Sequence, residues 1–271
     1  MKIIDCFTFY NELDLLFYRL SILYEHVDSF VIVEANQTFS GKAKHSYFLE
    51  NQERFRPFMD KIEHVIVDLP YHWPNIDFSK DEQWINERYQ RDAIQMGVNQ
   101  IQEKVGLDDH DLIVISDIDE IEDPELLLSC RRGDIVIPDK GVTIPMDFYY
   151  YNLRSKNGES WYGAKMVPYK QLKIAVPESI RNKIDVGSLP KKYGWHLSYF
   201  GDSQYIQNKM VHFSHQEFNN DFYTNMENIQ RRIDNTTDLY ERSYIPSMIK
   251  IPLENNDYLP PQYETLLKNY L

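Results

Sequence analysis

The stretch Asp111-Leu112-Ile113-Val114-Ile115-Ser116-Asp117-Ile118-Asp119-Glu120 carries the strongest fold signal in the chain. Its run of four apolar residues is typical of a strand buried on both faces of a parallel sheet, and the acids follow at the C-terminal end of that strand. Side chains two positions apart in an extended chain point the same way, so Asp117 and Asp119 can meet one cation. Mg²⁺ and Mn²⁺ accept such oxygen ligands together with phosphate oxygens, so the stretch predicts a metal-held phosphate.

Short β-rich runs alternate with helical patterns through the first half of the chain. The predicted strands are residues 2–7, 29–34, 62–68 and 111–116, and the predicted helices are residues 13–26, 50–60 and about 80–105. Ser79-Lys80-Asp81-Glu82 reads as a capping box, Gly106 as a helix end, and Asp123-Pro124 as the start of another helix. This alternation predicts an α/β fold with a mainly parallel, doubly wound central sheet. Ligands of such sheets bind at the C-terminal ends of the strands, where the acidic stretch lies.

The pattern changes after about residue 133. The predicted strands are residues 134–138, 142–152 and 161–169, with a hairpin turn at Asn157-Gly158, and the predicted helices are residues 203–213 and 217–235. The tail contains Pro246, Pro252, Pro260 and Pro261 and is expected to wrap the surface. We predict one domain, residues 1–271, with a nucleotide-binding half (1–132), an acceptor-binding half (133–235) and a wrapping tail (236–271).

Composition excludes several classes of function. The formal net charge of −13 argues against a general nucleic-acid binder, which would carry a basic surface. An anionic substrate would therefore need a metal or a few well-placed cations. The two cysteines, Cys6 and Cys130, lie in or beside apolar segments and are expected to be buried thiols. We find no apolar run of about 20 residues and no signal-peptide pattern, so the expected location is the cytoplasm.

Two other uses of an Asp-x-Asp element fit the sequence less well. A calcium-binding EF-hand loop starting at Asp117 would need glycine at its sixth position, which is Glu122. A phosphatase with an aspartyl nucleophile would usually carry the motif on its first strand, followed by Thr or Val rather than Glu120. The two acids could also simply cap the helix that starts near Pro124, but Asp123 already provides that cap. Metal-diphosphate binding is therefore the favoured interpretation.

Candidates for donor binding come from the helix before the acidic strand and from the first two strand ends. Arg88, Arg91 and Asp92 share one helix face, which could orient a nucleotide or form an ordinary surface ion pair. The remaining candidates follow the first two strands, where side chains could read a base, a ribose or a diphosphate: Phe9, Asn11, Glu12, Glu34 and Lys42. Asn11 could equally serve only as a helix cap.

Three histidines are candidate metal ligands beside the two aspartates. His196 lies in Gly194-Trp195-His196-Leu197-Ser198, and His212 and His215 follow closely. A single histidine is more often a core or surface group than a ligand. A metal held by Asp117 and Asp119 would need further ligands, and His196 is the first candidate among the three histidines.

Several of these segments together resemble glycosyltransferase family 17. They include Ile3-Ile4-Asp5-Cys6-Phe7-Thr8-Phe9-Tyr10-Asn11-Glu12, Phe30-Val31-Ile32-Val33-Glu34-Ala35-Asn36, Glu87-Arg88-Tyr89-Gln90-Arg91-Asp92, Ser116-Asp117-Ile118-Asp119-Glu120-Ile121 and the Trp195-His196 segment. The resemblance runs over about residues 3–235. The animal members that the chain is similar to are β-1,4-mannosyl-glycoprotein 4-β-N-acetylglucosaminyltransferases. We expect this chain to lack their membrane anchor and stem, a departure that bears on the N-glycan acceptor more than on the chemistry.

The resemblance implies a GT-A fold, a UDP-sugar donor, a glycan acceptor and transfer with inversion. Asp117 and Asp119 match the family's Asp-x-Asp element, which would bridge Mn²⁺ or Mg²⁺ to the donor diphosphate; UDP-N-acetylglucosamine is the expected donor. Inversion needs a general base for the acceptor hydroxyl, and the candidates from the second half are Asp202, Glu178, Asp185 and Glu217. Candidate acceptor-stacking residues are Tyr149, Tyr150, Trp161, Tyr162 and Trp195.

The sequence leaves two other functions open. A sugar-1-phosphate nucleotidyltransferase also binds a nucleotide and a metal on an α/β sheet. It would usually carry a glycine-rich loop with basic residues after the first strand, and residues 7–12 contain neither glycine nor a basic residue. A non-catalytic carbohydrate-binding protein would bind ligand without transferring or hydrolysing it.

Overall fold

The computed structural model describes residues 1–242 and 248–271. Its larger sheet has the order β10-β6-β9-β4-β1-β2-β3. The strands are β1 (Ile3–Thr8), β2 (Ser29–Ala35), β3 (Ile62–Val67), β4 (Leu112–Asp117), β6 (Val142–Thr143), β9 (Lys165–Pro168) and β10 (Gly187–Ser188). Neighbours among β3, β2, β1 and β4 pair in parallel, β9 runs antiparallel to β4 and β6, and β10 runs parallel to β6. The predicted α/β class is confirmed.

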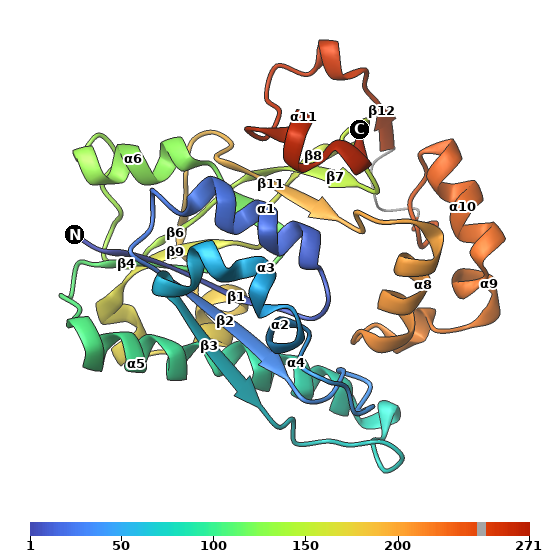
Figure 1. Ribbon diagram of the computed structural model, residues 1–271, viewed down its shortest axis with the longest axis horizontal. Helices are drawn as coiled ribbons and strands as arrows, with labels where there is room; N and C mark the ends of the chain where they lie inside the picture. Colours follow the sequence, from blue (N-terminus) through green and yellow to red (C-terminus); the bar gives the residue numbers. More distant parts are fainter. Residues whose placement is uncertain (243–247) are drawn as a thin grey trace.

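Helices cover both faces of this sheet because side chains alternate along each strand. On one face, Ile3 and Phe7 of β1 belong to the core that includes α1 (Leu13–Leu23) and α6 (Pro124–Arg132). On the other face, Ile4 and Cys6 belong to the core that includes α5 (Ile94–Val105). Figure 1 shows α1 and α5 on opposite sides of the strands.

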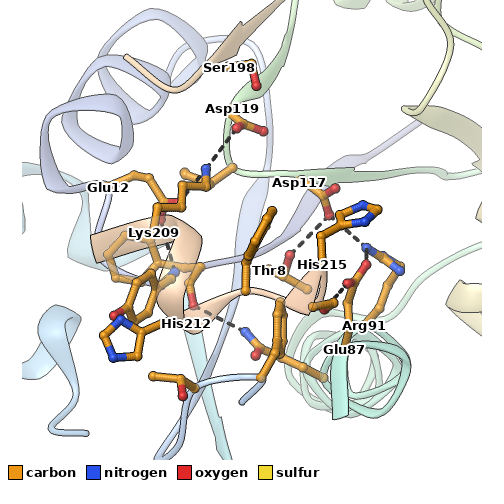
Figure 2. Close-up of a pocket in the computed structure, with 18 of the residues that line it drawn as sticks. Thr8, Glu12, Glu87, Arg91, Asp117, Asp119, Ser198, Lys209, His212 and His215 are labelled. Atoms are coloured by element: carbon orange, nitrogen blue, oxygen red, sulfur yellow. Dashed lines mark hydrogen bonds and ion pairs between the residues drawn. The ribbon is translucent and has the colours of Figure 1, made fainter. Parts of the chain in front are cut away.

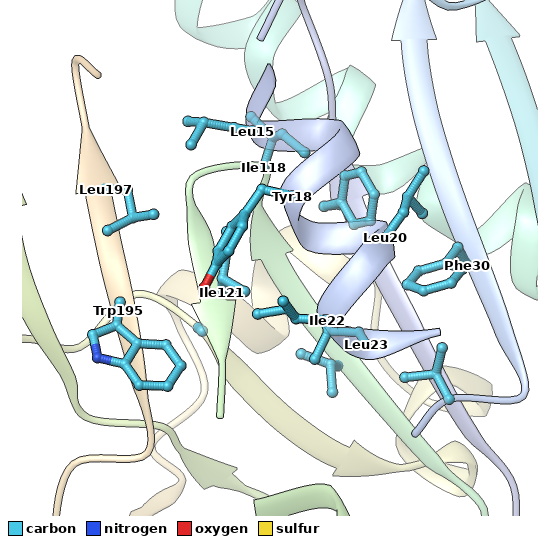
Figure 3. Close-up of a cluster of buried hydrophobic side chains, with 14 of the residues drawn as sticks. Leu15, Tyr18, Leu20, Ile22, Leu23, Phe30, Ile118, Ile121, Trp195 and Leu197 are labelled. Atoms are coloured by element: carbon cyan, nitrogen blue, oxygen red, sulfur yellow. The ribbon is translucent and has the colours of Figure 1, made fainter. Parts of the chain in front are cut away.

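A second sheet begins at the acidic stretch. Its order is β12-β8-β7-β11-β5, with β5 (Glu120–Glu122), β7 (Met146–Tyr150), β8 (Ser155–Trp161), β11 (Gly194–Ser198) and β12 (Met248–Lys250). Only a turn, Ile118-Asp119, separates the end of β4 from the start of β5. Figure 3 shows Leu15 and Tyr18 of α1 with Ile121 of β5 and Trp195 and Leu197 of β11, all in one buried cluster. The Asp-x-Asp element therefore lies where the two sheets meet.

Three of the first-half predictions need correction. The long helix 80–105 is two helices, α4 (Glu82–Asp92) and α5, which part at Ala93. The segment 50–60 is α2 (Tyr47–Glu50), α3 (Gln52–Phe55) and a 3₁₀ helix, Arg56–Lys61, which contains Pro57 near its start. Ser79 does not cap α4. Instead, Asp77 accepts a hydrogen bond from the Ser79 amide, and Glu82 reaches back to the Asp77 amide at 2.6 Å. Gly106 ends α5 and Asp123 caps α6, as predicted.

The second half departs further from the strand predictions. Residues 134–138 form no strand, and the segment 142–152 divides at Pro145 into β6 and β7, which belong to different sheets. Asn157-Gly158 lies inside β8, and the chain reverses earlier, after Tyr151 in the left-handed region (φ 68°). Of residues 161–169, only the part that forms β9 and the end of β8 is strand. For β6 and β9, hydrogen bonding to strands elsewhere in the chain decides the boundaries, and local patterns do not report it.

The predicted helix 203–213 is α8 (Ser203–His212). The predicted helix 217–235 is broken where Asn220 and Asn225 cap new helices: it becomes α9 (Asp221–Thr224) and α10 (Met226–Asn235). The remaining helices are α7 (Pro177–Asn182), α11 (Tyr263–Leu266) and the 3₁₀ helices Phe78–Lys80, Tyr169–Lys173, Gln216–Phe218, Leu253–Asn255 and Lys268–Tyr270. Pro246 of the predicted tail lies outside the described residues.

Cys6 and Cys130 are buried free thiols, as predicted. Among the helices described, none has the length and apolar character needed to cross a bilayer.

Candidate active site

A cavity of about 420 Å³ opens beside the C-terminal ends of β1 and β4. Helices α4, α7 and α8 and strand β11 complete its walls. Figure 2 shows side chains that meet there, among them Thr8 of β1, Arg91 of α4 and Lys209 of α8. The polar lining residues are Thr8, Glu12, Gln37, Thr38, Lys44, Glu87, Gln90, Arg91, Asp117, Asp119, Arg181, Asn182, His196, Ser198, Lys209, His212, Ser214 and His215. The site thus lies at the edge predicted for a parallel α/β sheet.

Asp117 is held by two guanidinium groups. Arg91 of α4 donates to its Oδ1 at 3.2 Å, and Arg181 of α7 donates to its Oδ2 at 2.8 Å. The Thr8 hydroxyl donates to Oδ1 at 3.2 Å. Burial alone would raise the pKa of Asp117, but Arg181 and Arg91 outweigh it and lower the pKa to about 2. The side chain is still 31% exposed toward the cavity, so an ionised carboxylate faces the ligand space.

Asp119 meets cations from the second half of the chain. Lys209 of α8 donates to its Oδ2 at 3.2 Å, and the His196 Nε2 lies 3.5 Å from its Oδ1. Burial opposes ionisation here as well, but Lys209 and then His196 bring the pKa of Asp119 well below its ordinary value. Lys209 also pairs with Glu12 at 3.0 Å. Two acids of one motif are therefore ionised by groups from different elements.

Glu120 lies beneath the motif and is fully buried. Both its oxygens accept hydrogen bonds from Arg181, at 2.6 and 2.7 Å, and Oε2 also accepts from the Asp117 amide at 3.0 Å. The Trp161 Nε1 donates to Oε1. Arg181 thus bridges a buried acid and a cavity acid, which fixes the position of Asp117.

The cavity also has an aromatic part. Its aromatic side chains are Phe9, Tyr10, Phe39, Trp84, Trp161, Tyr199 and Phe213. Trp84 stands edge-on to His215, with ring centroids 4.6 Å apart. Flat ligand rings pack well against such surfaces, so the cavity can take a base or a sugar face beside a charged group.

The structure brings four of the nine predicted donor residues to the cavity: Phe9, Glu12, Arg91 and Asp117. The other five do not line it. Asn11 turns toward Asn208, and Lys42 is exposed. Glu34 is buried and pairs with Lys44 at 2.7 Å.

Arg88 and Asp92 lie on the same helix as Arg91 but outside the lining. Asp92 accepts a hydrogen bond from the Glu178 amide at 2.9 Å. Sharing a helix face did not place all three residues in the site, because α4 presents only part of that face to the cavity.

All five predicted metal ligands line the cavity, but they do not gather around one point in it. Within the described ranges, no three His, Cys, Asp or Glu residues are grouped so as to hold a metal. His196 is stacked on Phe148, with centroids 4.7 Å apart. The Nδ1 atoms of His212 and His215 bond to the Asn208 carbonyl and to Glu217. Asp117 and Asp119 could hold Mg²⁺ if substrate phosphates and water completed its coordination sphere.

None of the four predicted bases lines the cavity. Asp202 caps α8 through the Tyr205 amide, at 2.8 Å, and faces a separate pocket. Glu178 pairs with Arg91, Asp185 is exposed, and Glu217 bonds to His215. Outside the Asp-x-Asp pair, the described carboxylates that line the cavity are Glu12 and Glu87.

Of the predicted acceptor residues, Trp161 lines the cavity. Tyr149, Tyr150 and Trp195 are at most 3% exposed and belong to the core, and Tyr162 points to solvent, 56% exposed. Strands β7 and β11 are buried along their whole length, so both faces of each strand are covered and their rings belong to the core.

Several lining residues were missed from the sequence: Thr8, Glu87, Arg181 and Lys209. Glu87 bonds to Arg91 at 2.9 Å and to the Ser214 hydroxyl. The position of Glu87, four residues before Arg91 on a helix, was an available signal. Arg181 and Lys209 had none, because their partners lie more than 60 residues away in the chain.

Comparison with known proteins agrees with the sequence motifs. Residues 1–248 match the model of glycosyltransferase family 17. Among solved structures, the chain is similar to the crystal structure of 4-diphosphocytidyl-2C-methyl-D-erythritol synthase. The identity is 13%, the TM-score is 0.40, and the similarity covers 74% of this chain and 90% of that one. A similarity at that level carries no information on activity. No curated protein matches the chain.

Proposed function

Since this chain belongs to glycosyltransferase family 17, we propose that it transfers N-acetylglucosamine from UDP-N-acetylglucosamine to a glycan hydroxyl with inversion, using Mn²⁺ or Mg²⁺. One observation carries the proposal. The two acids of the Asp-x-Asp element, Asp117 and Asp119, face the same cavity as ionised carboxylates, beside aromatic rings that could hold a base.

The charge of the cavity supports a metal. Its described lining has four carboxylates, Glu12, Glu87, Asp117 and Asp119, and four basic side chains, Lys44, Arg91, Arg181 and Lys209. These formal charges cancel, so the lining does not offset the negative charge of a diphosphate. A divalent ion on Asp117 and Asp119 would offset it, and would stabilise the charge that develops on departing UDP.

Side chains of the cavity would orient the metal-binding acids and provide a surface for the sugar. Arg91 and Arg181 keep Asp117 ionised and fixed in direction. Lys209 forms ion pairs with both Glu12 and Asp119. A change of charge on either acid would therefore act directly on the Lys209 ammonium group. Trp161 presents a ring on which a sugar can stack.

The general base for the acceptor hydroxyl is assigned to the cavity acids outside the motif. Glu12 is 4% exposed and is held by Lys209 and by the amides of Tyr10 and Asn11. Glu87 is 20% exposed, so it is the more accessible to an acceptor. The Gln variant of the true base would still bind UDP but would lose the acidic limb of the pH–rate profile.

The test measures UDP release from a panel of UDP-sugars, with and without Mn²⁺, for the wild type, Asp117→Asn and Asp119→Asn. We expect UDP-N-acetylglucosamine to be preferred. Each substitution should lower turnover at least about 100-fold, because the metal's contribution amounts to several kcal/mol. Asp123→Asn is the matched control: it keeps a helix cap on the same segment, outside the cavity lining.

The proposal would be contradicted if UDP release were the same with and without Mn²⁺ and unchanged by both substitutions. Metal-dependent UDP binding without transfer or donor hydrolysis would instead indicate a non-catalytic binding protein.

A further inference from the structure

A buried arginine contacts the backbone of the turn that carries the motif. Arg19 lies in α1, its side chain is fully buried, and it does not line the cavity. Its Nη1 donates to the carbonyl oxygens of Asp117 at 3.0 Å and Glu120 at 2.8 Å, with a longer contact of 3.4 Å to the Ile118 carbonyl. One nitrogen thus reaches three carbonyls of a four-residue segment.

The other guanidinium nitrogens anchor Arg19 to three strands. Nε donates to Asp5 of β1 at 2.7 Å, and Nη2 donates to the second oxygen of the same carboxylate. Nη2 also reaches the Ser116 hydroxyl on β4 at 2.8 Å and Glu122 on β5 at 3.1 Å. The guanidinium therefore links β1, the end of β4 and the start of β5 around the turn.

This arrangement needs arginine rather than a generic cation. The chain leaves the larger sheet at Asp117 and enters the smaller one at Glu120, so some carbonyls between them have no strand partner. A buried carbonyl without a partner is unfavourable, and a planar guanidinium can satisfy several acceptors in fixed directions. Lysine has three donors on one nitrogen and could not reach the turn and Asp5 in the same way.

We propose that Arg19 is a positioning residue for the reaction: it holds the backbone from Asp117 to Glu120 so that both motif carboxylates keep the spacing a metal requires. This inference rests on the proposed function. Partners that orient metal ligands without touching the metal commonly change metal affinity by about 10- to 100-fold when they are replaced. A purely structural ion pair would change only stability.

The experiment compares Arg19→Lys with Arg232→Lys. Arg232 is also a buried arginine, 1% exposed, but it lies on α10 and pairs with Glu241, away from the cavity lining. For each protein, UDP binding is titrated at increasing Mn²⁺ to find the half-effective Mn²⁺ concentration, and thermal unfolding is recorded alongside. Amide hydrogen exchange of residues 117–122 is the second readout.

We expect Arg19→Lys to raise the half-effective Mn²⁺ concentration at least about tenfold and to speed exchange at residues 117–122. Arg232→Lys should lose stability without either change. Equal Mn²⁺ dependence in the two variants, or unchanged exchange in Arg19→Lys, would overturn the positioning role.

If Arg19→Lys does not fold, Ser116→Ala decides. It removes one hydrogen bond of Arg19 and should raise the half-effective Mn²⁺ concentration about threefold; a wild-type value would overturn the proposal. If the wild type shows no Mn²⁺-dependent UDP binding, the proposed function fails. The exchange of residues 117–122 then still decides whether Arg19 holds the turn.

Discussion

The segment from Asp117 to Glu122 has a cavity side and a core side, and Asp117 on the first and Glu122 on the second have opposite pKa shifts. On the cavity side, Asp117 faces two guanidinium groups and its pKa falls to about 2. On the core side, Glu122 is fully buried, and it shares Arg19 with Asp5. Burial, then the charge of Asp5, raises the pKa of Glu122 to about 8, and Arg19 offsets them only in part.

Burial alone does not set the charge of these acids, because Asp119 is also nearly buried, with 9% of its side chain exposed, and its pKa falls. The number of cations for each carboxylate decides it: two guanidinium groups contact Asp117, whereas one serves both Asp5 and Glu122. The cavity side keeps ionised groups ready for a ligand. The core side favours a neutral Glu122, which lowers the cost of burying a second acid.

Removing a cavity-side cation should have the largest effect on stability. In Arg181→Met, the fully buried Glu120 loses both of its guanidinium hydrogen bonds, and Asp117 loses one. Breaking a buried pair by removing one partner costs about 3–5 kcal/mol, which urea unfolding can measure. The control, Arg132→Met, removes pairs with Glu125 and Asp134 from an arginine that is 51% exposed. It should cost under about 1 kcal/mol; equal losses would break the comparison.

The core side predicts a pH effect of definite sign. The pKa of Glu122 is about 8 in the folded protein and has an ordinary value of 4.5 when unfolded. Between these pH values the folded state keeps the proton and the unfolded state releases it, so stability falls as pH rises. The fall is at most about 1.4 kcal/mol per pH unit. Urea unfolding from pH 5 to pH 8 should show this loss in the wild type relative to Glu122→Gln.

Glu25 is exposed, so Glu25→Gln is a control for the loss of one negative charge. This variant should keep the pH dependence of the wild type. A wild type and Glu122→Gln with parallel pH profiles would mean that Glu122 is already ionised in the folded protein.

The smallest predicted effect concerns Trp161, which lines the cavity and also contacts the buried acid Glu120. Its Nε1 donates to the buried carboxylate Glu120, whereas the Trp195 Nε1 donates to the neutral Tyr258 carbonyl at 3.0 Å. Hydrogen bonds to charged groups contribute about 1.5–3 kcal/mol and neutral ones about 1. The hydrogen-bond part of the loss in urea unfolding should therefore be about 1 kcal/mol larger for Trp161→Phe than for Trp195→Phe, whose ring is the more deeply buried of the two. A larger loss in Trp195→Phe would show that packing dominates.

Strands of the first half could be predicted because their signals are local. The apolar run before Asp117 is buried wherever the sheet places it, and β4 ends within one residue of the prediction. The candidate bases do not line the cavity, and the reason is the opposite one. An acid that begins a helix, such as Asp202, can cap that helix or face a ligand, and only the packing of α8 decided for the cap. Lys209 had no local signal, because its partners Glu12 and Asp119 come from other elements.

By itself, the sequence determined the α/β alternation, the family and the two acids at the end of β4. All three depend on short-range periodicity and on motifs that are contiguous in the chain. Only the tertiary structure decided which cations face those acids and which arginine holds their backbone. Arg19, Arg181 and Lys209 meet the motif across about 60 to 100 residues of chain, and such pairings are set by strand register and helix packing, which no local pattern encodes.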